Sequence, residues 1–252
     1  MRKKQLVLFA ILLAVYALVI FVSYAFFFDQ LTQGLPTPAP QSNIPPWILG
    51  LANAGIFLVL YCLLGLAGYW FARKVGLPGV FREDGNWRGW VGAPLVYGLV
   101  LGIFLVAVDE AIAASGMGEH FIHPAFPFSL LASLSAGIGE EILFRGFVFG
   151  LWAFLLNLIL KRWNKTGLAL WLANVIAALA FAAGHLPAAM LLLKVPTPLD
   201  LPPVVIAELI LLNGIVGIAA GERYMKDGLV AAAGVHFWAD IVWHVIWPMV
   251  MG

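Results

Sequence analysis

The sequence has few charged residues and almost no cysteine. Only 11% of its 252 residues are Asp, Glu, Lys or Arg, and 63% are hydrophobic, whereas about 25% of the residues in a soluble domain are charged. This composition excludes a soluble globular protein. The net charge of +1 gives no reason to expect nucleic-acid binding. The one cysteine, Cys62, lies in an apolar run and excludes an internal disulfide.

The sequence also lacks internal repeats, coiled-coil heptads and the short alternating segments of a membrane β-barrel. Its apolar runs are unbroken and about 20 residues long, which is the length of a membrane-spanning helix. We therefore expect an all-α, polytopic transmembrane helical bundle with about seven spanning helices. It would be a multi-pass integral membrane protein, in the cell membrane if the chain is prokaryotic. The expected spans are roughly 6–28, 47–71, 90–108, 127–160, 168–187, 203–220 and 229–250.

We expect these spans to form one integrated membrane domain. Its first part, residues 1–126, would hold three helices with their linkers, and residues 127–252 would form the catalytic core. The Pro-rich segment 29–46 is expected to be an external linker with no chemistry. The loop 77–89 mixes charges of both signs and is expected to be a solvated surface that faces the headgroups.

Lys and Arg are distributed unevenly between the predicted loops. On one side lie Arg2, Lys3, Lys4, Arg73, Lys74, Arg82, Arg88, Lys161, Arg162, Lys165, Arg223 and Lys226. Lys194 alone lies on the other side, and Arg145 lies within a span. Because cytoplasmic loops carry the excess of basic residues, we expect a cytoplasmic N-terminus and an external C-terminus.

The stretch GIGEEILFRGFVFG at 137–150 places Glu140, Glu141 and Arg145 inside an apolar run. Each charge at membrane depth costs about 2.5 to 3.5 kcal/mol, so such residues indicate a functional site. Glu141 and Arg145 are four positions apart on one helix face, and Glu140 points about 100° away. Glu141 and Arg145 could simply be a buried ion pair that locks helices together. Glu140, without a cation, suits a general base.

Two further groups of polar residues lie on later spans. Phe181 and His185 are four positions apart in FAAGHLP, just before Pro187, which is expected to end the helix. His236, Asp240 and His244 lie along one face of the last span and suit metal ligation or an oxyanion site. A lone histidine in an apolar helix is often only a packing residue, and the role of His244 stays open.

A fourth buried acid, Glu208, has no comparable neighbours in sequence and is a lesser candidate. It could simply pair with Arg145 or an asparagine. Outside the spans, Glu119 and His123 could contribute to a metal site, although an ordinary exposed loop is the simpler interpretation.

The three motifs, in this order, resemble the type II CAAX prenyl protease and bacteriocin-processing family of intramembrane proteases, also called CPBP or Abi. The resemblance covers about residues 127–250 and implies peptide-bond hydrolysis by a water that Glu140 and His185 activate. His236 and Asp240 would stabilise the oxyanion, while Glu141, Arg145 and Phe181 would support the site. The implied substrate is a membrane-associated peptide or lipidated protein, CAAX-type proteins included, in contact with the lipid bilayer.

Asp240 departs from the usual pattern of the CAAX-processing members, which have Asn at this position. An aspartate cannot donate to an oxyanion unless it is protonated, which favours a metal-ligand or histidine-orienting role. A divalent metal such as zinc, held by Glu140, His185 and His236, is one alternative, and catalysis without a cofactor is the other. A proton-coupled transporter and a non-catalytic scaffold of the same fold are competing functions.

The positions of the motifs along their spans predict a shared site. Glu140 and His185 are about equally far from the basic turn at 161–166, but His236 lies close to the turn at Gly228. The three residues can lie at the same depth in the membrane only if the hairpin tip, residues 148–178, extends past the site and bends or lies along the cytoplasmic interface. An enzyme of this kind is expected to have a polar cavity that opens to the cytoplasm or sideways to lipid.

Overall fold

The computed structural model describes residues 2–32, 44–118 and 120–251, and within these ranges it consists of helices joined by loops, with no strand. The α-helices are α1 (Lys3–Phe26), α2 (Phe28–Leu31), α3 (Pro46–Lys74), α4 (Ala93–Ala114), α5 (Phe128–Glu141), α6 (Gly150–Leu160), α7 (Thr166–Gly184), α8 (Leu186–Leu193), α9 (Pro203–Asp227), α10 (Leu229–Asp240) and α11 (Trp247–Met251). Three π-helical segments are η1 (Arg88–Gly92), η2 (Ile142–Phe149) and η5 (Ile241–Ile246), and two 3₁₀ segments are η3 (Lys161–Trp163) and η4 (Pro198–Asp200).

Within the described residues, seven helical runs are long and apolar enough to cross a membrane, which confirms the predicted all-α bundle. They are Lys3–Phe26, Pro46–Lys74, Arg88–Ala114, Phe128–Trp163, Thr166–Leu193, Pro203–Asp227 and Leu229–Met251. The fifth run passes Pro187, where the sequence predicted an end. α7 does end at Gly184, but α8 begins at once with Pro187 in its first turn, where the missing N–H of proline costs no hydrogen bond.

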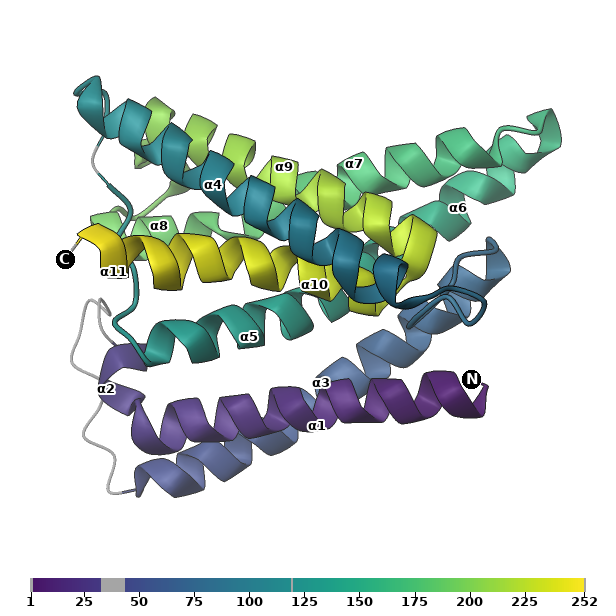
Figure 1. The fold of residues 1–252 in the computed structure, drawn as a ribbon, viewed down its shortest axis with the longest axis horizontal. Helices are drawn as coiled ribbons and strands as arrows, with labels where there is room; N and C mark the ends of the chain where they lie inside the picture. The colour runs from purple at the N-terminus through teal and green to yellow at the C-terminus, as the bar shows by residue number, and fades with distance from the viewer. Residues whose placement is uncertain (1, 33–43, 119, 252) are drawn as a thin grey trace.

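Successive spans alternate in direction, so the bundle has two distinct ends (Figure 1). We call one the basic end, because it carries all the basic residues of the N-terminus, the α3–α4 loop, the α6–α7 turn and the α9–α10 turn. The other is the outer end, formed by α2, the end of α4, the start of α5, and α8. The charge distribution predicts that the basic end faces the cytoplasm.

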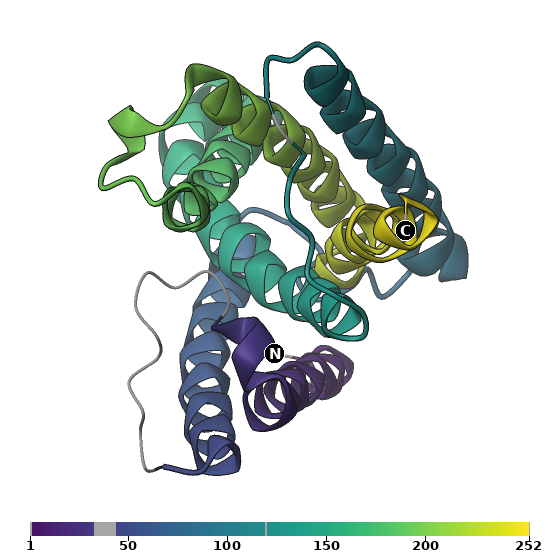
Figure 2. The same ribbon diagram turned by 90° about the vertical axis from the view of Figure 1, so that its left-hand side faces the viewer.

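α10 is the central helix of the bundle. It packs against α4, α5 and α9, while α1 and α3 form a pair beside this group (Figure 2). Its buried positions are mostly small: Ala231, Ala232 and Ala239 are fully buried. Small residues let helix backbones approach closely in a membrane protein. The site residues that α10 carries are therefore held within the packed core.

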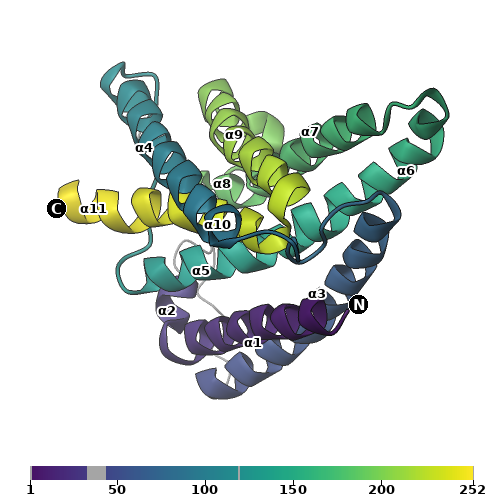
Figure 3. The same ribbon diagram turned by 45° about the vertical axis from the view of Figure 1, so that its right-hand side comes forward.

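The α6–α7 hairpin diverges from the other helices at the basic end and projects beyond them (Figures 1 and 3). Its surface is apolar, and Leu158, Ile159 and Trp171 are about half exposed. The extension past the site agrees with the expectation from the motif depths. The course of the tip along the membrane interface stays a prediction.

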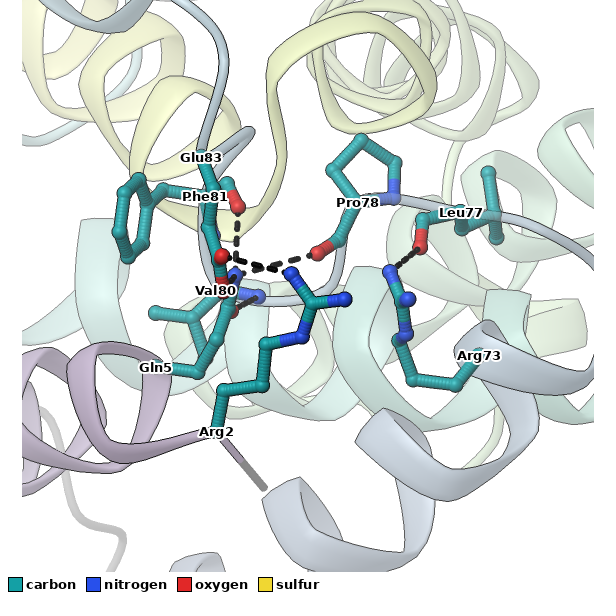
Figure 4. A network of polar contacts seen from close by, with 8 residues as sticks. All are labelled: Arg2, Gln5, Arg73, Leu77, Pro78, Val80, Phe81 and Glu83. Carbon is teal, nitrogen blue, oxygen red and sulfur yellow. Dashed lines mark hydrogen bonds and ion pairs between the residues drawn. The ribbon is translucent and has the colours of Figure 1, made fainter.

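The loop after α3 is a solvated surface only in its second half, where the charged residues Arg82, Glu83, Asp84 and Arg88 are exposed, because residues 77–80 of its first half are buried. Gln5 of α1 holds this half: its Nε2 donates to the Phe81 carbonyl at 2.8 Å and its Oε1 accepts from the Val80 N–H at 2.9 Å (Figure 4). At the exposed rim, Arg2 pairs with Glu83 at 2.9 Å. That hydrogen bond holds the pKa of Glu83 below its ordinary value.

The same loop also fastens the turn between α9 and α10. The Leu229 N–H donates to the Gly79 carbonyl at 3.0 Å, and the Arg82 N–H donates to the Asp227 carbonyl at 2.8 Å. Sequence patterns miss such an arrangement, since it satisfies backbone groups of segments far apart in the chain.

We predict that Gly68→Ala destabilises the protein, because a Cβ at this position of α3 would collide with the carbonyl of Gly146 in η2. Overpacking of this kind costs about 1 to 3 kcal/mol. Gly55→Ala on the same helix is the matched control, since a Cβ there meets nothing within 4 Å. Thermal unfolding in detergent measures both variants. Equal melting temperatures would contradict the close approach of α3 and η2.

Candidate active site

The two adjacent glutamates at the end of α5 have different environments. The Glu141 side chain is fully buried, while that of Glu140 is 35% exposed and lies in a cavity. Their different directions on the helix account for this, as the sequence predicted. The chain becomes π-helical directly after them, at Ile142. π-Helical turns inside α-helices are frequent at functional sites.

Glu141 lies at the centre of a buried charge network. Its Oε1 is 2.9 Å from Arg145 Nη1 and 2.9 Å from His236 Nδ1. The Arg145 guanidinium also lies over the ring of Phe181, 4.4 Å from its centroid, which is a cation–π arrangement. Gly217 of α9 makes room for it, since a Cβ there would lie 3.0 Å from Nη2. One carboxylate thus ties α5 and η2 to α10.

The ring of His236 has a fixed orientation. A carboxylate that is paired with an arginine can only accept a hydrogen bond, so His236 Nδ1 donates to Glu141. The other ring nitrogen, Nε2, lies 3.6 Å from Asp240 Oδ2. His236 and Asp240 both line the cavity that contains Glu140. The His236 ring therefore connects the buried network to the cavity.

His185 lies at the junction of α7 and α8, opposite Glu140. Its Nδ1 lies 2.9 Å from the Phe181 carbonyl oxygen, and since a carbonyl only accepts, Nδ1 carries the proton. Nε2 then faces Glu140 Oε2 at 3.9 Å. This distance is too long for a direct hydrogen bond and suits a bridging water.

Phe181 is the packing centre of the site. It is 1% exposed, and its ring lies edge-on to those of His185 and His236, with centroids 4.8 and 5.2 Å away. Together with the Arg145 contact, these neighbours fix the relative positions of α7, α10 and η2. The structure thus brings all seven residues of the three motifs around one site.

The cavity has a volume of about 280 Å³. It is lined by Leu105, Phe121, Ile122, Pro124, Ala132, Ala136, Glu140, Phe181, His185, Ala188, Ala189, Leu192, Leu209, Leu212, Asn213, Val216, His236, Asp240, Trp243 and His244. From Glu140 and His185 the lining continues toward the outer end through Ala136 and Ala132 of α5 and Ala188 and Leu192 of α8, while Phe181 and Val216 line the cavity on the basic side of His185.

Residues 120–124, which we call the roof segment, cover the cavity at the outer end. Asp109 of α4 anchors this segment: its Oδ1 accepts from the Phe121 N–H at 3.2 Å, and its Oδ2 lies 2.8 Å from His120 Nδ1. The hydrogen bond with Asp109 raises the pKa of His120. The charged form of this contact is thus fully present below the ordinary histidine pKa, and it is lost as the pH rises through the raised value.

The residues whose roles the sequence left open lie toward the outer end. His244 lines the cavity, and its Nδ1 is 3.0 Å from His123 Nδ1 of the roof segment. Glu208 is 3% exposed and does not line the cavity. Of the two partners that the sequence left open for Glu208, Arg145 is not one, because Arg145 lies against Glu141.

Sequence reasoning missed Asp109 and Asn213. Asp109 is 1% exposed at the end of a span, beyond the predicted boundary at residue 108. Asn213 lines the cavity, and its Nδ2 donates to the Leu209 carbonyl at 3.0 Å. A polar residue within the apolar run of α9 was the available signal.

The predicted metal set does not meet the geometry of a bound ion. The ligand atoms of Glu140, His185 and His236 are not within 4.8 Å of one another, and His236 Nδ1 is already bonded to Glu141. In the described ranges, one group of three does meet this distance: Asp109, Glu110 and His120, at the outer end. The sequence also suggested that Glu119 and His123 could contribute to a metal site, and Glu119 lies outside the described residues.

Comparison with protein-family models matches residues 122–242 to the one described as type II CAAX prenyl endopeptidase Rce1-like. Neither the curated proteins nor the solved structures include a significant match to this chain. The matched range begins in the roof segment, ends just after Asp240, and contains all three motifs.

We predict that Arg145→Met destabilises the protein by about 3 to 5 kcal/mol, because it leaves the fully buried Glu141 carboxylate without its cation. Lys165→Met, at the exposed tip of the α6–α7 hairpin, is the control and should change stability by less than about 0.5 kcal/mol. Thermal unfolding in detergent compares the two. A melting temperature of Arg145→Met equal to that of the control would show that the pair does not support the fold.

Proposed function

Since the chain carries an Rce1-like type II CAAX prenyl endopeptidase domain at residues 122–242, we propose that it is a membrane-embedded endopeptidase. The scissile peptide bond belongs to a membrane-associated substrate, and Glu140 and His185 activate the attacking water. One observation carries this proposal: Glu140 Oε2 and His185 Nε2 face each other across 3.9 Å in the cavity.

This spacing fits one water molecule that donates to both groups. The Glu140 carboxylate accepts one of its hydrogen bonds, and the bare Nε2 of His185 accepts the other. Such a water directs its lone pairs away from both residues, toward a substrate carbonyl in the cavity. Glu140 takes the proton as the water oxygen bonds to the carbonyl carbon, which is general-base catalysis.

The tetrahedral intermediate carries a negative oxygen that requires a hydrogen-bond donor. His236 is the candidate donor, because Nδ1 is held by Glu141 and Nε2 faces the cavity beside Asp240. As an imidazolium between two carboxylates, it can donate from Nε2. Asp240 then balances the positive charge of the imidazolium and orients its ring, a role that an aspartate can fill without donating a proton itself.

Breakdown of the intermediate completes the reaction. The C–N bond breaks, and the proton on Glu140 passes to the leaving amine, so that Glu140 returns to its carboxylate form. The products are a carboxylic acid and an amine, and one water is consumed. No step of this mechanism uses a metal ion, since the ligand atoms of Glu140, His185 and His236 do not lie within 4.8 Å of one another.

The competing functions make different use of these residues. A proton-coupled transporter needs polar groups that continue from the site toward both membrane faces. On the basic side of the site the buried side chains are of both kinds, since Asn174, Arg223 and Asp227 are buried there as well as apolar Ile142, Phe149 and Val235. Transporters are typically built from repeats, and the sequence contains no internal repeat. A non-catalytic scaffold would keep the packing but would show no hydrolysis, so an assay separates it from the enzyme.

We predict that Glu140→Gln lowers peptide hydrolysis by about 10²- to 10⁴-fold, because the amide cannot accept the proton of the water. Purified protein and a library of apolar peptides, prenylated CAAX-type peptides included, provide the assay. Asp84→Asn makes the same carboxylate-to-amide change at an exposed position of the α3–α4 loop, outside the site, and should keep the activity. A Glu140→Gln variant that retains the full rate would eliminate this mechanism.

The geometry also predicts that chelators do not abolish hydrolysis. His236 Nδ1 is hydrogen-bonded to Glu141, and the ligand atoms of Glu140, His185 and His236 do not lie within 4.8 Å of one another. Rates are compared with and without EDTA or 1,10-phenanthroline. A rate that is lost with chelator and restored by added Zn²⁺ would contradict the metal-free mechanism.

A further inference from the structure

Three acidic residues and a histidine gather at the outer end, and the proposed mechanism uses none of them. Asp109 and Glu110 lie near the end of α4, His120 begins the roof segment, and Glu208 lies near the start of α9. None of the four lines the cavity that contains Glu140. They therefore form a polar group separate from the active site.

Asp109, Glu110 and His120, which we call the outer cluster, have the spacing of metal ligands. One ligand atom from each lies within 4.8 Å of the other two. His120 Nδ1 is 2.8 Å from Asp109 Oδ2 and 3.6 Å from Glu110 Oε1. Ligand atoms that each lie about 2.0 to 2.2 Å from one ion are at most about 4.4 Å apart. Small adjustments of these side chains therefore suffice to place all three around one cation.

The Asp109 carboxylate is already oriented for this role. Its side chain is 1% exposed, and its Oδ1 accepts from the Phe121 N–H at 3.2 Å, which leaves Oδ2 facing His120 Nδ1. Hydrogen bonds of this kind orient the ligands of metal sites. The side chains of Glu110 and His120 are 36% and 50% exposed, so an ion can reach the outer cluster from solvent.

A fourth side chain, Glu208, faces the outer cluster from α9. The helices α4 and α9 pack together in opposite directions, and Leu105 and Leu212 belong to one buried cluster. One helical turn further toward the outer end, the two helices carry Asp109 and Glu208. The hydrogen bond with Asp109 raises the pKa of His120 most, and the charge of Glu208 raises it further.

Glu208 is buried and lacks a partner. It is 3% exposed, and its Oε1 has no hydrogen-bond partner among the described residues. Within the same ranges, His120 is the one basic side chain that forms an ion pair with any of the three carboxylates. Buried charges in proteins are paired or coordinate metals. Three carboxylates and one imidazole therefore leave a negative charge that a divalent cation would balance.

We propose that the outer cluster binds one divalent cation of the kind that takes nitrogen and oxygen ligands together, such as Zn²⁺ or Mn²⁺. Asp109 Oδ2, Glu110 Oε1 and His120 Nδ1 bind the ion, and Glu208 accepts a hydrogen bond from a water on it. The ion replaces the proton between Asp109 and His120, and this proton passes to solvent. Three protein ligands with one water are a common zinc set, whereas Mg²⁺ prefers oxygen ligands alone.

The bound ion fastens the roof segment to α4 and, through its water, to α9. Its ligands do not line the cavity, so the ion takes no part in peptide hydrolysis. The inference is therefore independent of the proposed function. Chelation should lower the melting temperature without lowering the rate of hydrolysis at temperatures well below it.

Metal titration of the purified full chain, in detergent and without a polyhistidine tag, tests the proposal. The protein is treated with EDTA, freed of the chelator, and titrated with Zn²⁺ or, in parallel, with Mg²⁺. We expect one bound Zn²⁺ per chain by elemental analysis. The melting temperature should rise by about 5 to 10 °C at a Zn²⁺ concentration of about 100 times Kd. Mg²⁺ at the same concentration should give a much smaller rise.

Variants at partly exposed positions locate the ion without removing the buried Asp109. Glu110→Gln and His120→Ala each remove one ligand and should lose the Zn²⁺-dependent rise in melting temperature. Glu208→Gln, which removes the partner of the bound water, should weaken Zn²⁺ binding by about 10- to 100-fold. Asp29→Asn changes an exposed carboxylate of α2 at the same end and is the control, with wild-type binding expected.

Absence of bound Zn²⁺ in the wild-type protein would overturn the proposal, as would a full rise in melting temperature in either ligand variant. Zn²⁺ binding that is lost in Glu140→Gln or His185→Ala but kept in His120→Ala would place the ion at the active site. That result would overturn both this inference and the metal-free mechanism. A protein that binds Zn²⁺ through the outer cluster but hydrolyses no peptide would contradict the proposed function alone.

Discussion

The arrangement of the site depends on one buried carboxylate. Glu141 contacts both Arg145 and His236 at 2.9 Å, with no exposure to solvent. Burying a charge without a partner costs several kcal/mol, so each member of this network requires the others. The network fixes the position of α10 against α5 and η2, and it fixes which ring nitrogen of His236 faces the cavity. The directions of Glu140 and Asp240 follow from these helix positions.

Two adjacent carboxylates can serve opposite purposes because a helix turns about 100° at each residue. Glu141 is committed to the buried network, whereas Glu140 has no arginine or lysine partner among the described residues and lies in the cavity opposite His185. Both α5 and α10 become π-helical directly after their site residues, at Ile142 and Ile241. A π-helical turn is wider than an α-helical one, so the residues that follow it point in other directions than they would in a regular α-helix. Such turns are frequent at functional sites.

The sequence predicted the parts of this protein that depend on local pattern. Apolar runs gave the seven spans, and the four-residue spacings identified the motifs and the Glu141–Arg145 pair. The contact of Glu141 with His236 could not be predicted, because it depends on how α5 and α10 pack. The same holds for Gln5 against the loop before Arg82, and for Asp109 against the roof segment. The cavity is also a product of packing, because residues of several helices line it.

The central claim is that Glu140 and His185 act on the same water, and a double-mutant cycle tests it most directly. kcat/KM for one cleaved peptide is measured for the wild-type protein, Glu140→Gln, His185→Ala and the double variant. Residues that act as a unit have strongly non-additive effects. The account predicts that the double variant is about as impaired as the worse single variant. A double variant whose loss equals the product of the two single losses would show independent roles and contradict the account.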